Sequence, residues 1–464
     1  MSGKSKPGLF LCHTRISSFI IIGSVLAFLA LYSLSFDQTV KGLGVAPDDV
    51  CARKRIHVLE LPPRFNYGLL DECSTISKKK DMCVYIQNGG FGPRIFDESL
   101  GGGEEGSWYD TDQFTLELIF HTRMKSYRCL TSDYALANAV YVPFYAGLEA
   151  SRTLRSRTGV RDRVAKEVMK HVSASEAWRA FEGRDHFFVA GRIGKDFGRP
   201  VNSTSWGNSL MSQPESRHVT MLTIEASGRA NEVGIPYPTC FHPSSSEALW
   251  SWQKMVESRV RKHLFAFAGA PRRRGSIRDE VIAQCEGAGE ACGLLSCENW
   301  RNESCQSPLN VLKLFSNSKF CLQPPGDSPT RRSTFDSILS GCVPVFFSLR
   351  SGPEQYAWHF PSNWTEYSVY INPDEFRAKR IKIGEVLSAI SEDTVKAMRL
   401  KVIEMIPRVI YRDPIQQESE REREKEEDAF DIAVKGILNR VEENKKAVFG
   451  GRDKRCSNLS LDGD

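Results

Sequence analysis

The sequence lacks the short motifs that mark several large enzyme classes. It contains no G-x-S-x-G nucleophile elbow, no G-x-x-x-x-G-K-[ST] phosphate loop and no H-E-x-x-H helix. Hydrolase and NTPase functions therefore have no sequence support. The net charge of +5 over 464 residues is small, and basic residues are not interleaved with aromatic ones as in nucleic-acid-binding proteins. A nucleic-acid partner is not expected.

Charge is also absent from one long stretch near the N-terminus. Residues 16–34 carry none, and their number is enough to span a thin bilayer. Basic residues precede the stretch and acidic residues follow it: Lys4, Lys6 and Arg15, then Asp37, Asp48 and Asp49. This bias predicts a cytosolic tail (1–15), a transmembrane signal-anchor (16–34) and a stem (35–54), with the rest of the chain in the lumen. A cleaved signal peptide ending near Ser33 or Ser35 is the alternative, but its apolar region would be too long.

Zinc-type cysteine spacing is absent as well. None of the thirteen cysteines forms a C-x-x-C pair, so disulfides are favoured over zinc, also within the cluster Cys285, Cys292, Cys297 and Cys305. Cys12 falls in the predicted tail, which leaves an even twelve for the lumen. Four N-x-S/T sequons would be glycosylated there: Asn202, Asn302, Asn363 and Asn458. The anchor, the cysteines and the sequons agree on the secretory pathway.

Helix-like and strand-like segments alternate along the chain, which predicts an α/β fold. A first domain over residues 55–245 would hold an amphipathic helix at 111–129. Its buried parallel strands are expected at 139–145, 186–190 and 218–224. A second domain over residues 246–415 would begin with a helix at 250–263 and a strand at 264–268. Residues 416–464 form a charged segment with a final helix at 429–448 that can pack back across both domains.

The most informative segment is Phe320–Phe347, which predicts a strand, a Pro/Gly-rich loop, a helix ending at Gly341 and a second strand. In such units the helix N-terminus points into the crevice at the carboxyl edge of the sheet, where phosphate binds. Arg331 and Arg332 occupy the first turn of this helix, where the helix dipole repels a cation unless an anion is present. We therefore predict a bound diphosphate. The alternative is a surface ion pair between Arg332 and Asp336.

A second loop strengthens the diphosphate prediction. Gly269 and Arg272 follow the strand at 264–268, so two arginine-bearing loops could close on a diphosphate from two sides. Asp336 lies one turn beyond Arg332, within reach of a ribose or sugar hydroxyl. The predicted donor-binding residues are Gly269, Arg272, Gly326, Asp327, Ser328, Arg331, Arg332 and Asp336.

Two places could supply a metal ligand or a base. Asp110-Thr-Asp112 matches the D-x-D pattern by which many sugar transferases hold Mn²⁺, but chance gives about one such match in a chain of this composition. Asp462-Gly-Asp464 is a second match, and Asp112 could simply cap a helix. His186, beside Asp185 at the start of a predicted strand, could accept a proton, or could be a buried histidine bonded to backbone.

Several long segments, in order, resemble the exostosin-like transferases of glycosyltransferase family 47. They are LPPRFN (61–66), YDTDQFTLELIFHTRM (109–124), YVPFYAGL (141–148), GRDHFFVAGRI (183–193), PYPTCFHPSS (236–245), FAGAPR (267–272) and the 320–347 segment. The plant xyloglucan galactosyltransferases are the subgroup most resembled. Many other members place one arginine three positions before a glutamate at the donor helix. Here Ser333 takes that place and Asp336 replaces the glutamate, an arrangement that the xyloglucan subgroup shares.

The resemblance implies a GT-B fold of two Rossmann-like domains facing across a cleft, with the donor in the C-terminal domain. It implies a Golgi type II membrane enzyme that transfers galactose from UDP-galactose to xylose side chains of xyloglucan, a cell-wall hemicellulose. The transfer would be inverting and would need no metal or cofactor; Asp112 and His186 are the candidate bases. Other expected partners are the Golgi membrane and other Golgi glycosyltransferases. UDP-galacturonate or UDP-arabinose as donor, or a non-catalytic Golgi scaffold, are the alternatives.

Overall fold

The computed structural model describes residues 49–97, 106–272, 274–297, 307–414 and 427–457. The chain divides into two units, residues 1–52 and 53–464. Within the first unit only residues 49–52 are described, so the predicted tail and anchor lie outside the described residues. Among the helices that are described, none is both long enough and apolar enough to cross a membrane. All the described helices and strands belong to the second unit.

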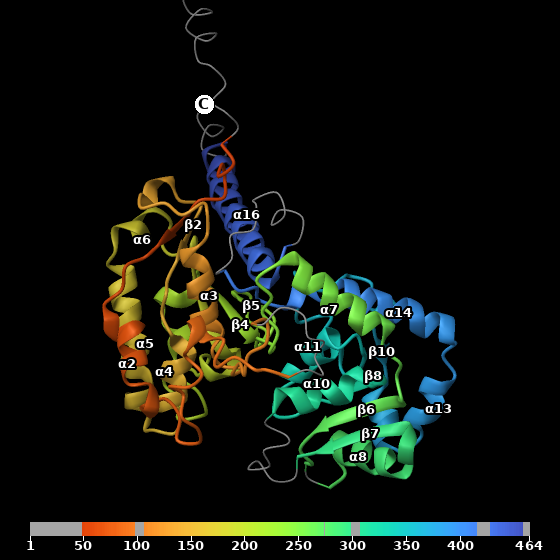
Figure 1. Cartoon of the computed structure of the whole chain (residues 1–464). Coiled ribbons are helices and arrows are strands. Elements are labelled where there is room, and N and C mark those ends of the chain that lie inside the picture. The colour runs from red at the N-terminus through yellow and green to blue at the C-terminus, as the bar shows by residue number, and fades with distance from the viewer. Residues whose placement is uncertain (1–48, 98–105, 273, 298–306, 415–426, 458–464) are drawn as a thin grey trace, which may run out of the picture. The chain divides into compact units, whose positions relative to one another are not determined.

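The first half of this unit is built on a five-stranded parallel sheet in the order β1-β2-β3-β4-β5. Its strands are β1 (Ile56–Val58), β2 (Ala139–Tyr141), β3 (His186–Ile193), β4 (Thr220–Glu225) and β5 (Glu232–Gly234). Its helices are α2 (Tyr67–Asp71), α3 (Leu116–Lys125), α4 (Ala146–Thr153), α5 (Thr158–Ser173) and α6 (Glu176–Phe181). Figure 1 shows them beside the sheet. The middle strands are apolar runs because both faces of a parallel sheet are covered: Phe187, Phe188, Val189 and Ala190 are all fully buried.

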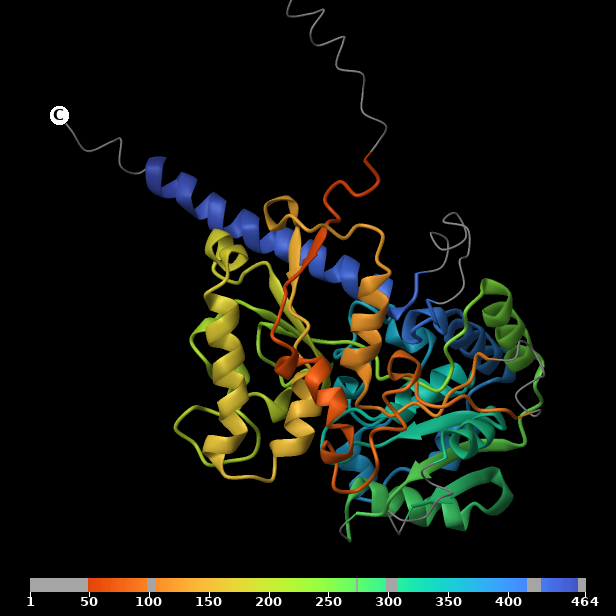
Figure 2. The same cartoon turned by 60° about the vertical axis from the view of Figure 1, so that its left-hand side comes forward.

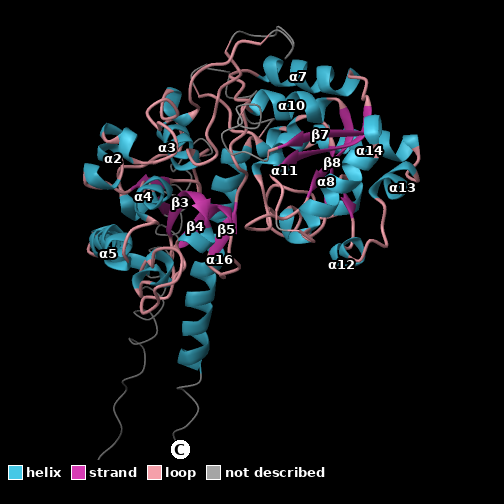
Figure 3. Ribbon diagram, turned by 90° about the horizontal axis from the view of Figure 1, so that it is seen from below, coloured by secondary structure: helices cyan, strands magenta, loops and turns pink. Residues whose placement is uncertain are grey.

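The second half holds another five-stranded parallel sheet, in the order β10-β9-β8-β6-β7. Figure 3 shows β3, β4 and β5 grouped in one half and β7 and β8 in the other. The strands are β6 (His263–Gly269), β7 (Cys292–Ser296), β8 (Ser318–Gln323), β9 (Val343–Phe346) and β10 (Val369–Tyr370). The helices are α7 (Ser246–Ser258), α8 (Ile277–Gly287), α10 (Pro308–Ser316), α11 (Arg332–Leu339), α12 (Pro373–Arg377), α13 (Ile383–Ser388) and α14 (Glu392–Glu404).

The strand order of the second sheet reverses direction between β6 and β8. The chain passes from β6 outward to β7 and then returns to β8 on the other side of β6. In open α/β sheets, ligands bind outside the carboxyl ends of the two strands at such a switch point. The loops after β6 and β8 are the two that the sequence singled out.

The strand–loop–helix–strand unit predicted at Phe320–Phe347 is confirmed. β8 ends at Gln323, and α11 buries Phe335, Ile338 and Leu339, the predicted apolar face. Gly341 follows α11 with φ +60°, the left-handed conformation that glycine adopts past a helix end. A Cβ at this position would also collide with the Val256 side chain, so only glycine fits.

Two predicted helices are displaced in the structure. The helix expected at 111–129 begins only at Leu116, because Asp112 Oδ1 accepts the Phe114 N–H (2.8 Å) and so folds residues 111–115 into a turn. The helix expected at 250–263 begins four residues earlier, at Ser246, where the Ser245 side chain accepts the Ala248 N–H. Local side-chain bonds to backbone decided both boundaries.

The last helix, α16 (Ala429–Ser457), returns to the first half and is longer than the predicted 429–448. Figure 2 shows it running along that half. Lys445 Nζ donates to the Asn138 carbonyl just before β2 (3.2 Å), while His359 of the second half contacts the Ala429 carbonyl. The helix thus contacts both halves, as the sequence predicted.

A buried charge cluster fixes the start of α16. The Arg123 guanidinium of α3 lies 3.0 Å from Asp428 Oδ2 and 3.6 Å from Asp431 Oδ2. Burial alone would raise the pKa of Asp428, but Arg123 and the N–H groups of Arg412 and Asp431 more than offset it, so its pKa is lowered. The ionised carboxylate is therefore part of the native state.

Asp428→Ala should destabilise the protein strongly, by about 3–5 kcal/mol, because it leaves Arg123 buried without its main counter-charge. The measurement is denaturant unfolding of the purified protein. Glu427→Ala is the matched control: Glu427 forms an exposed ion pair with Lys435 (3.0 Å), so its loss should cost about 0–1 kcal/mol. Equal effects of the two changes would contradict the importance of the buried cluster.

Candidate functional site

The loops that follow β6 and β8 meet at the switch point of the second sheet. Gly269 is the last residue of β6, and the Arg272 guanidinium after it forms an ion pair with Asp327 in the loop after β8 (2.8 Å). Two of the predicted donor-binding residues thus join the two loops. Gly326 and Ser328 flank Asp327, and the loop leads directly into α11.

Arg331 lies at the N-cap of α11, with no side-chain cap bond. Its Nη1 donates to Ser328 Oγ (2.7 Å) and to the Thr330 carbonyl (2.5 Å), while its buried Nη2 has no hydrogen-bond acceptor among the described residues. The guanidinium packs on Gly326, where any Cβ would overlap it. A side chain at position 326 would displace the Arg331 guanidinium from this place, and Arg331 retains a donor for a ligand.

Arg278, which the sequence interpretation missed, adds a third cation. It lies in the first turn of α8, after β6, is 7% exposed, and stacks on the Phe267 ring (6.0 Å). Burial and the charges of Arg331 and Arg272 lower its pKa to about 10. We call Arg272, Arg278 and Arg331 the arginine cluster. These guanidinium groups repel one another beside the N-termini of two helices. A bound anion would relieve the repulsion.

Arg332 points the other way, toward the first half. Its Nη1 donates to the Thr111 carbonyl (2.5 Å), its Nε lies 3.6 Å from Asp336 Oδ1, and its buried Nη2 has no acceptor among the described residues. Asp336 is 6% exposed, and burial raises its pKa to about 6 against the attraction of Arg332. The Arg332–Asp336 pair of the alternative is present, but Arg332 is only partly exposed and Asp336 is buried, so it is not a pair on the open surface.

Three groups of the first half surround Arg332: Lys80, Asp110 and Asp112. Lys80 forms an ion pair with Asp112, which is 5% exposed. Burial and the Arg332 charge lower the pKa of Lys80 to about 8, although Asp110 opposes this. Burial raises the pKa of the partly exposed Asp110 carboxyl, with Arg332 and Lys80 opposing. Both carboxylate oxygens of Asp112 are thus engaged, one with Lys80 and the other with the Phe114 N–H of its turn. Asp110, by contrast, stays partly exposed to solvent.

His186 lies far from this edge of its sheet. It is the first residue of β3, is fully buried, and its Nδ1 bonds to Asp185 Oδ1 (2.8 Å). Because the strands are parallel, this is the amino edge, opposite the carboxyl ends that meet the donor loops. His186 is thus buried, as the structural alternative held, but it bonds to the Asp185 carboxylate and not to backbone, and its buried Nε2 has no hydrogen-bond partner among the described residues.

The first half also contacts the loop between β8 and α11, which we call the donor loop. Glu225, the last residue of β4, accepts the Thr330 N–H through Oε2 (2.7 Å). Burial raises the pKa of Glu225, while the Thr330 bond and the charges of Arg331 and Arg350 oppose this. A carboxylate from one sheet thereby positions the loop that carries the arginines of the other.

The remaining predicted sites stand as follows. Asn202 and Asn363 are exposed, as a glycosylated asparagine must be, while Asn302 and Asn458 lie outside the described residues.

Disulfides join Cys73–Cys83, Cys285–Cys292 and Cys321–Cys342. Cys240 is buried and unbonded, so the even pairing of twelve cysteines is wrong at this residue. Within the described ranges, no three His, Cys, Asp or Glu side chains gather in a metal-binding arrangement.

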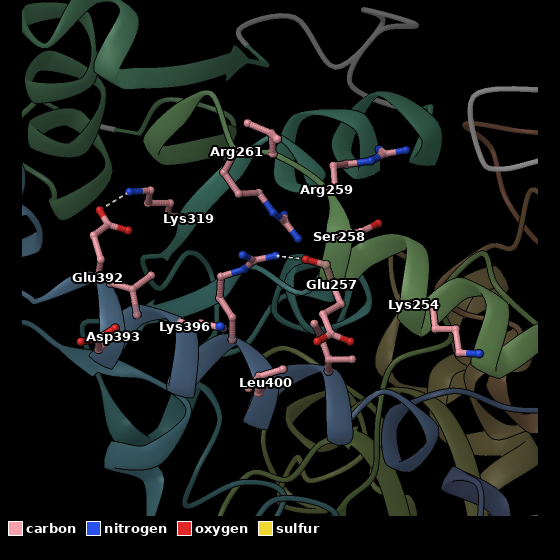
Figure 4. A pocket seen from close by; sticks show the side chains of 14 residues that line it. Lys254, Glu257, Ser258, Arg259, Arg261, Lys319, Glu392, Asp393, Lys396 and Leu400 are labelled. Atoms are coloured by element: carbon pink, nitrogen blue, oxygen red, sulfur yellow. Dashed lines mark hydrogen bonds and ion pairs between the residues drawn. The ribbon is translucent and has the colours of Figure 1, made fainter.

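A cavity of about 660 Å³ lies elsewhere, at the amino ends of β6 and β8 (Figure 4). Its arginines have a structural role. Arg261 donates to the Val256, Phe315 and Ser340 carbonyls, and Arg399 donates to the Val256 and Glu257 carbonyls, at the C-terminal ends of α7, α10 and α11. Cations are favourable at helix C-termini, so these groups hold three helices together.

Comparison with known proteins gives the family. The exostosin GT47 domain matches residues 50–387. Two relatives are from Arabidopsis thaliana: "Probable xyloglucan galactosyltransferase GT14" is 47% identical and covers 86% of this chain and 76% of its own. "Xyloglucan galactosyltransferase MUR3" is 43% identical and covers 87% and 65%. "Xyloglucan-specific galacturonosyltransferase 1", from the same plant, is 37% identical and covers 84% and 58%.

Among solved structures, Anabaena HepE in complex with UDP aligns with a TM-score of 0.33 and 10% identity, covering 85% of this chain and 99% of its own. The match of the family domain, the identity to the plant relatives and the two parallel sheets agree. The chain therefore belongs to the exostosin family of glycosyltransferases, family 47, with a GT-B-like fold.

Proposed function

We propose that this glycosyltransferase transfers galactose from UDP-galactose to xylose side chains of xyloglucan, in the Golgi lumen and anchored by residues 16–34. The names of the plant relatives support the reaction, and the N-terminal charge bias supports the topology. The observation that carries the proposal is the arginine cluster at the switch point, with Arg332 and Asp336 beside it.

The diphosphate of the donor binds at the N-terminus of α11. Arg331 and Arg332 each present a buried Nη2 without a protein acceptor among the described residues, and the planar guanidinium suits phosphate oxygens. Asp336, one turn further on, accepts hydrogen bonds from the ribose hydroxyls. Because arginines and a helix N-terminus supply the positive charge, we expect transfer without a divalent metal.

The reaction is a single displacement. The acceptor hydroxyl oxygen attacks the anomeric carbon, the bond from that carbon to the phosphate oxygen breaks, and its electron pair leaves with UDP. The hydroxyl proton goes to a carboxylate of the first half. Asp110 fits this role better than Asp112, because it is partly exposed, has a raised pKa, and lies in the field of Arg332.

The name of one relative supports a second candidate for the donor sugar. The relative named a xyloglucan-specific galacturonosyltransferase is 37% identical, so UDP-galacturonate is the second candidate donor. A non-catalytic scaffold is disfavoured, since a scaffold has no need for buried, mutually repelling arginines at helix N-termini.

The function is tested with the full-length protein in detergent, xyloglucan oligosaccharides, and UDP-galactose, UDP-galacturonate or UDP-arabinose. Galactose should be transferred to oligosaccharides with exposed xylose and not to unsubstituted glucan, as detected by mass spectrometry. Saturating EDTA should leave the rate largely unchanged. Transfer of galacturonate in place of galactose would change the assigned donor to UDP-galacturonate. A loss of activity in EDTA that Mn²⁺ restores would refute metal independence.

Arg332→Ala should lower kcat by roughly 10²–10³-fold, about 3–4 kcal/mol, because the leaving diphosphate loses one charge-assisted contact. Stability should also fall, by about 1–3 kcal/mol, since Asp336 keeps its burial but loses its counter-charge. Arg377→Ala removes an exposed arginine paired with Asp374 (2.5 Å) and should change neither quantity much. Near-normal turnover of Arg332→Ala would remove Arg332 from the donor site.

Asp110→Asn should lower kcat by roughly 10²–10⁴-fold with little change in the KM of the donor, because the amide cannot accept the proton. In the unmodified enzyme, kcat should fall as the pH drops through the Asp110 pKa, which burial raises above 3.8. The pH profile of kcat is the measurement. If Asp112→Asn is the change that abolishes turnover, while Asp110→Asn is active, the proton acceptor is Asp112.

A further inference from the structure

The loop at residues 199–207, after β3, is held by buried charges. Arg161 Nη1 donates to the carbonyls of Ser205 (2.8 Å) and Gly207 (2.9 Å). Arg199, 1% exposed, donates to the carbonyls of Pro200 and Gly207 (both 2.9 Å) and forms an ion pair with Asp162. Two buried guanidinium groups thus fix the backbone of a surface loop.

That loop carries Trp206, which is 48% exposed. Its indole Nε1 donates to Asp196 Oδ1 (2.6 Å), and Asp196, 2% exposed, is held in turn by Arg192 Nε (2.7 Å). A single exposed aromatic residue needs no explanation. An exposed ring whose edge is tied to a buried carboxylate, on a loop fixed by buried arginines, has a defined orientation before any ligand arrives, which lowers the entropy cost of binding.

Trp206 lines a cavity of about 630 Å³, within the range of about 300–1,000 Å³ for ligand sites. The lining includes Lys195, Arg199 and Ser205, which follow β3, and Ser227, Gly228 and Arg229, which follow β4. The cavity therefore lies at the carboxyl edge of the first sheet, the edge at which Glu225 holds the donor loop.

The two arginines of this cavity already have partners. Arg199 is paired with Asp162, and Arg229 donates to the Gly198 carbonyl and lies 3.4 Å from Glu232 Oε1. Lys195 is exposed and forms no ion pair among the described residues, so the cavity offers an anion one positive charge. An indole face with serine hydroxyls around it instead matches a pyranose ring, which has an apolar C–H face and a rim of hydroxyls.

One buried residue, Tyr237, interacts with both the donor site and the support of Trp206. Its charge interactions reach Glu225 and Arg331 on the one hand, and Arg192 and Asp196 on the other. Asp196 is the group that holds Trp206.

We propose that Trp206 is the stacking platform for the acceptor: a neutral, pyranose-based glycan chain lies on its indole face, and Ser205, Ser227 and Lys195 contact the sugar hydroxyls. The inference rests on the proposed function for the identity of the glycan, but not for the existence of the platform.

The test compares Trp206→Ala with Trp250→Ala in the full-length protein. Trp250 lies on α7 and is 46% exposed, so it matches the residue type and the exposure away from the cavity. Trp206→Ala should raise the KM for a xyloglucan oligosaccharide roughly 10-fold or more, with little change in the KM for UDP-galactose. Thermal stability should fall modestly, because buried Asp196 loses the indole donor. Trp206→Tyr should recover most of the affinity. Unchanged acceptor KM in Trp206→Ala would overturn the proposal.

A glycan array probed without donor separates this inference from the proposed function. If the unmodified protein binds a neutral glycan other than xyloglucan and Trp206→Ala loses that binding, the platform stands and the acceptor assignment falls. If neither protein binds any neutral glycan, the platform is refuted. Asn202→Gln tests a rival occupant, the chain's own glycan four residues away. Acceptor KM that responds to Trp206→Ala only when Asn202 is glycosylated would assign the ring to that glycan.

Discussion

Buried positive charge at the amino ends of α8 and α11 is the constraint on which the site depends. Desolvation, the helix dipoles and mutual repulsion all disfavour guanidinium groups there, as the lowered pKa of Arg278 reflects. Such a cluster persists only if the surrounding structure holds it in place and if a bound anion offsets the repulsion. Three interactions hold it in place here: the Arg272–Asp327 ion pair, the hydrogen bond from Thr330 to Glu225, and the packing of Arg331 on Gly326. The net charge that remains is the reason for proposing a diphosphate there.

The two halves meet at the groups to which we assign the chemistry. Glu225 of the first sheet accepts the Thr330 N–H of the donor loop, and Arg332 of the second half donates to Thr111 beside Asp110. A donor that recruits Arg332 therefore acts on the same network that sets the pKa values of Lys80 and Asp110. In the proposed mechanism, binding of the leaving group and basicity of the proton acceptor are therefore coupled through one arginine, which is a physical reason for placing it between the halves.

The parts of this arrangement that the sequence predicted are those written in local pattern. The apolar face of α11, its end at Gly341, and the place of Arg331 and Arg332 at its start follow from residue spacing alone. Arg278 and Lys80 could not be found that way, because their role comes from neighbours distant in sequence. A helix N-terminus predicted directly after β6 would have been the one available signal for Arg278. The place of His186 did follow from the sequence: it is predicted at the start of a parallel strand, and all strand starts of a parallel sheet share the amino edge, opposite the carboxyl edge where ligands bind.

Donor and acceptor recognition differ in where they are placed on the fold. The diphosphate residues occupy strand ends and helix N-termini, whose positions are set by the packing of the whole sheet and change only with it. Trp206 sits on a loop that is rigid for a different reason, the buried Arg161, Arg199 and Asp162 beneath it. A loop fixed from below can change its exposed residues without disturbing the core, and binding specificity concentrates on such loops. A shared donor site with a separately varied acceptor surface is how one fold can serve transferases that differ in the glycan they extend.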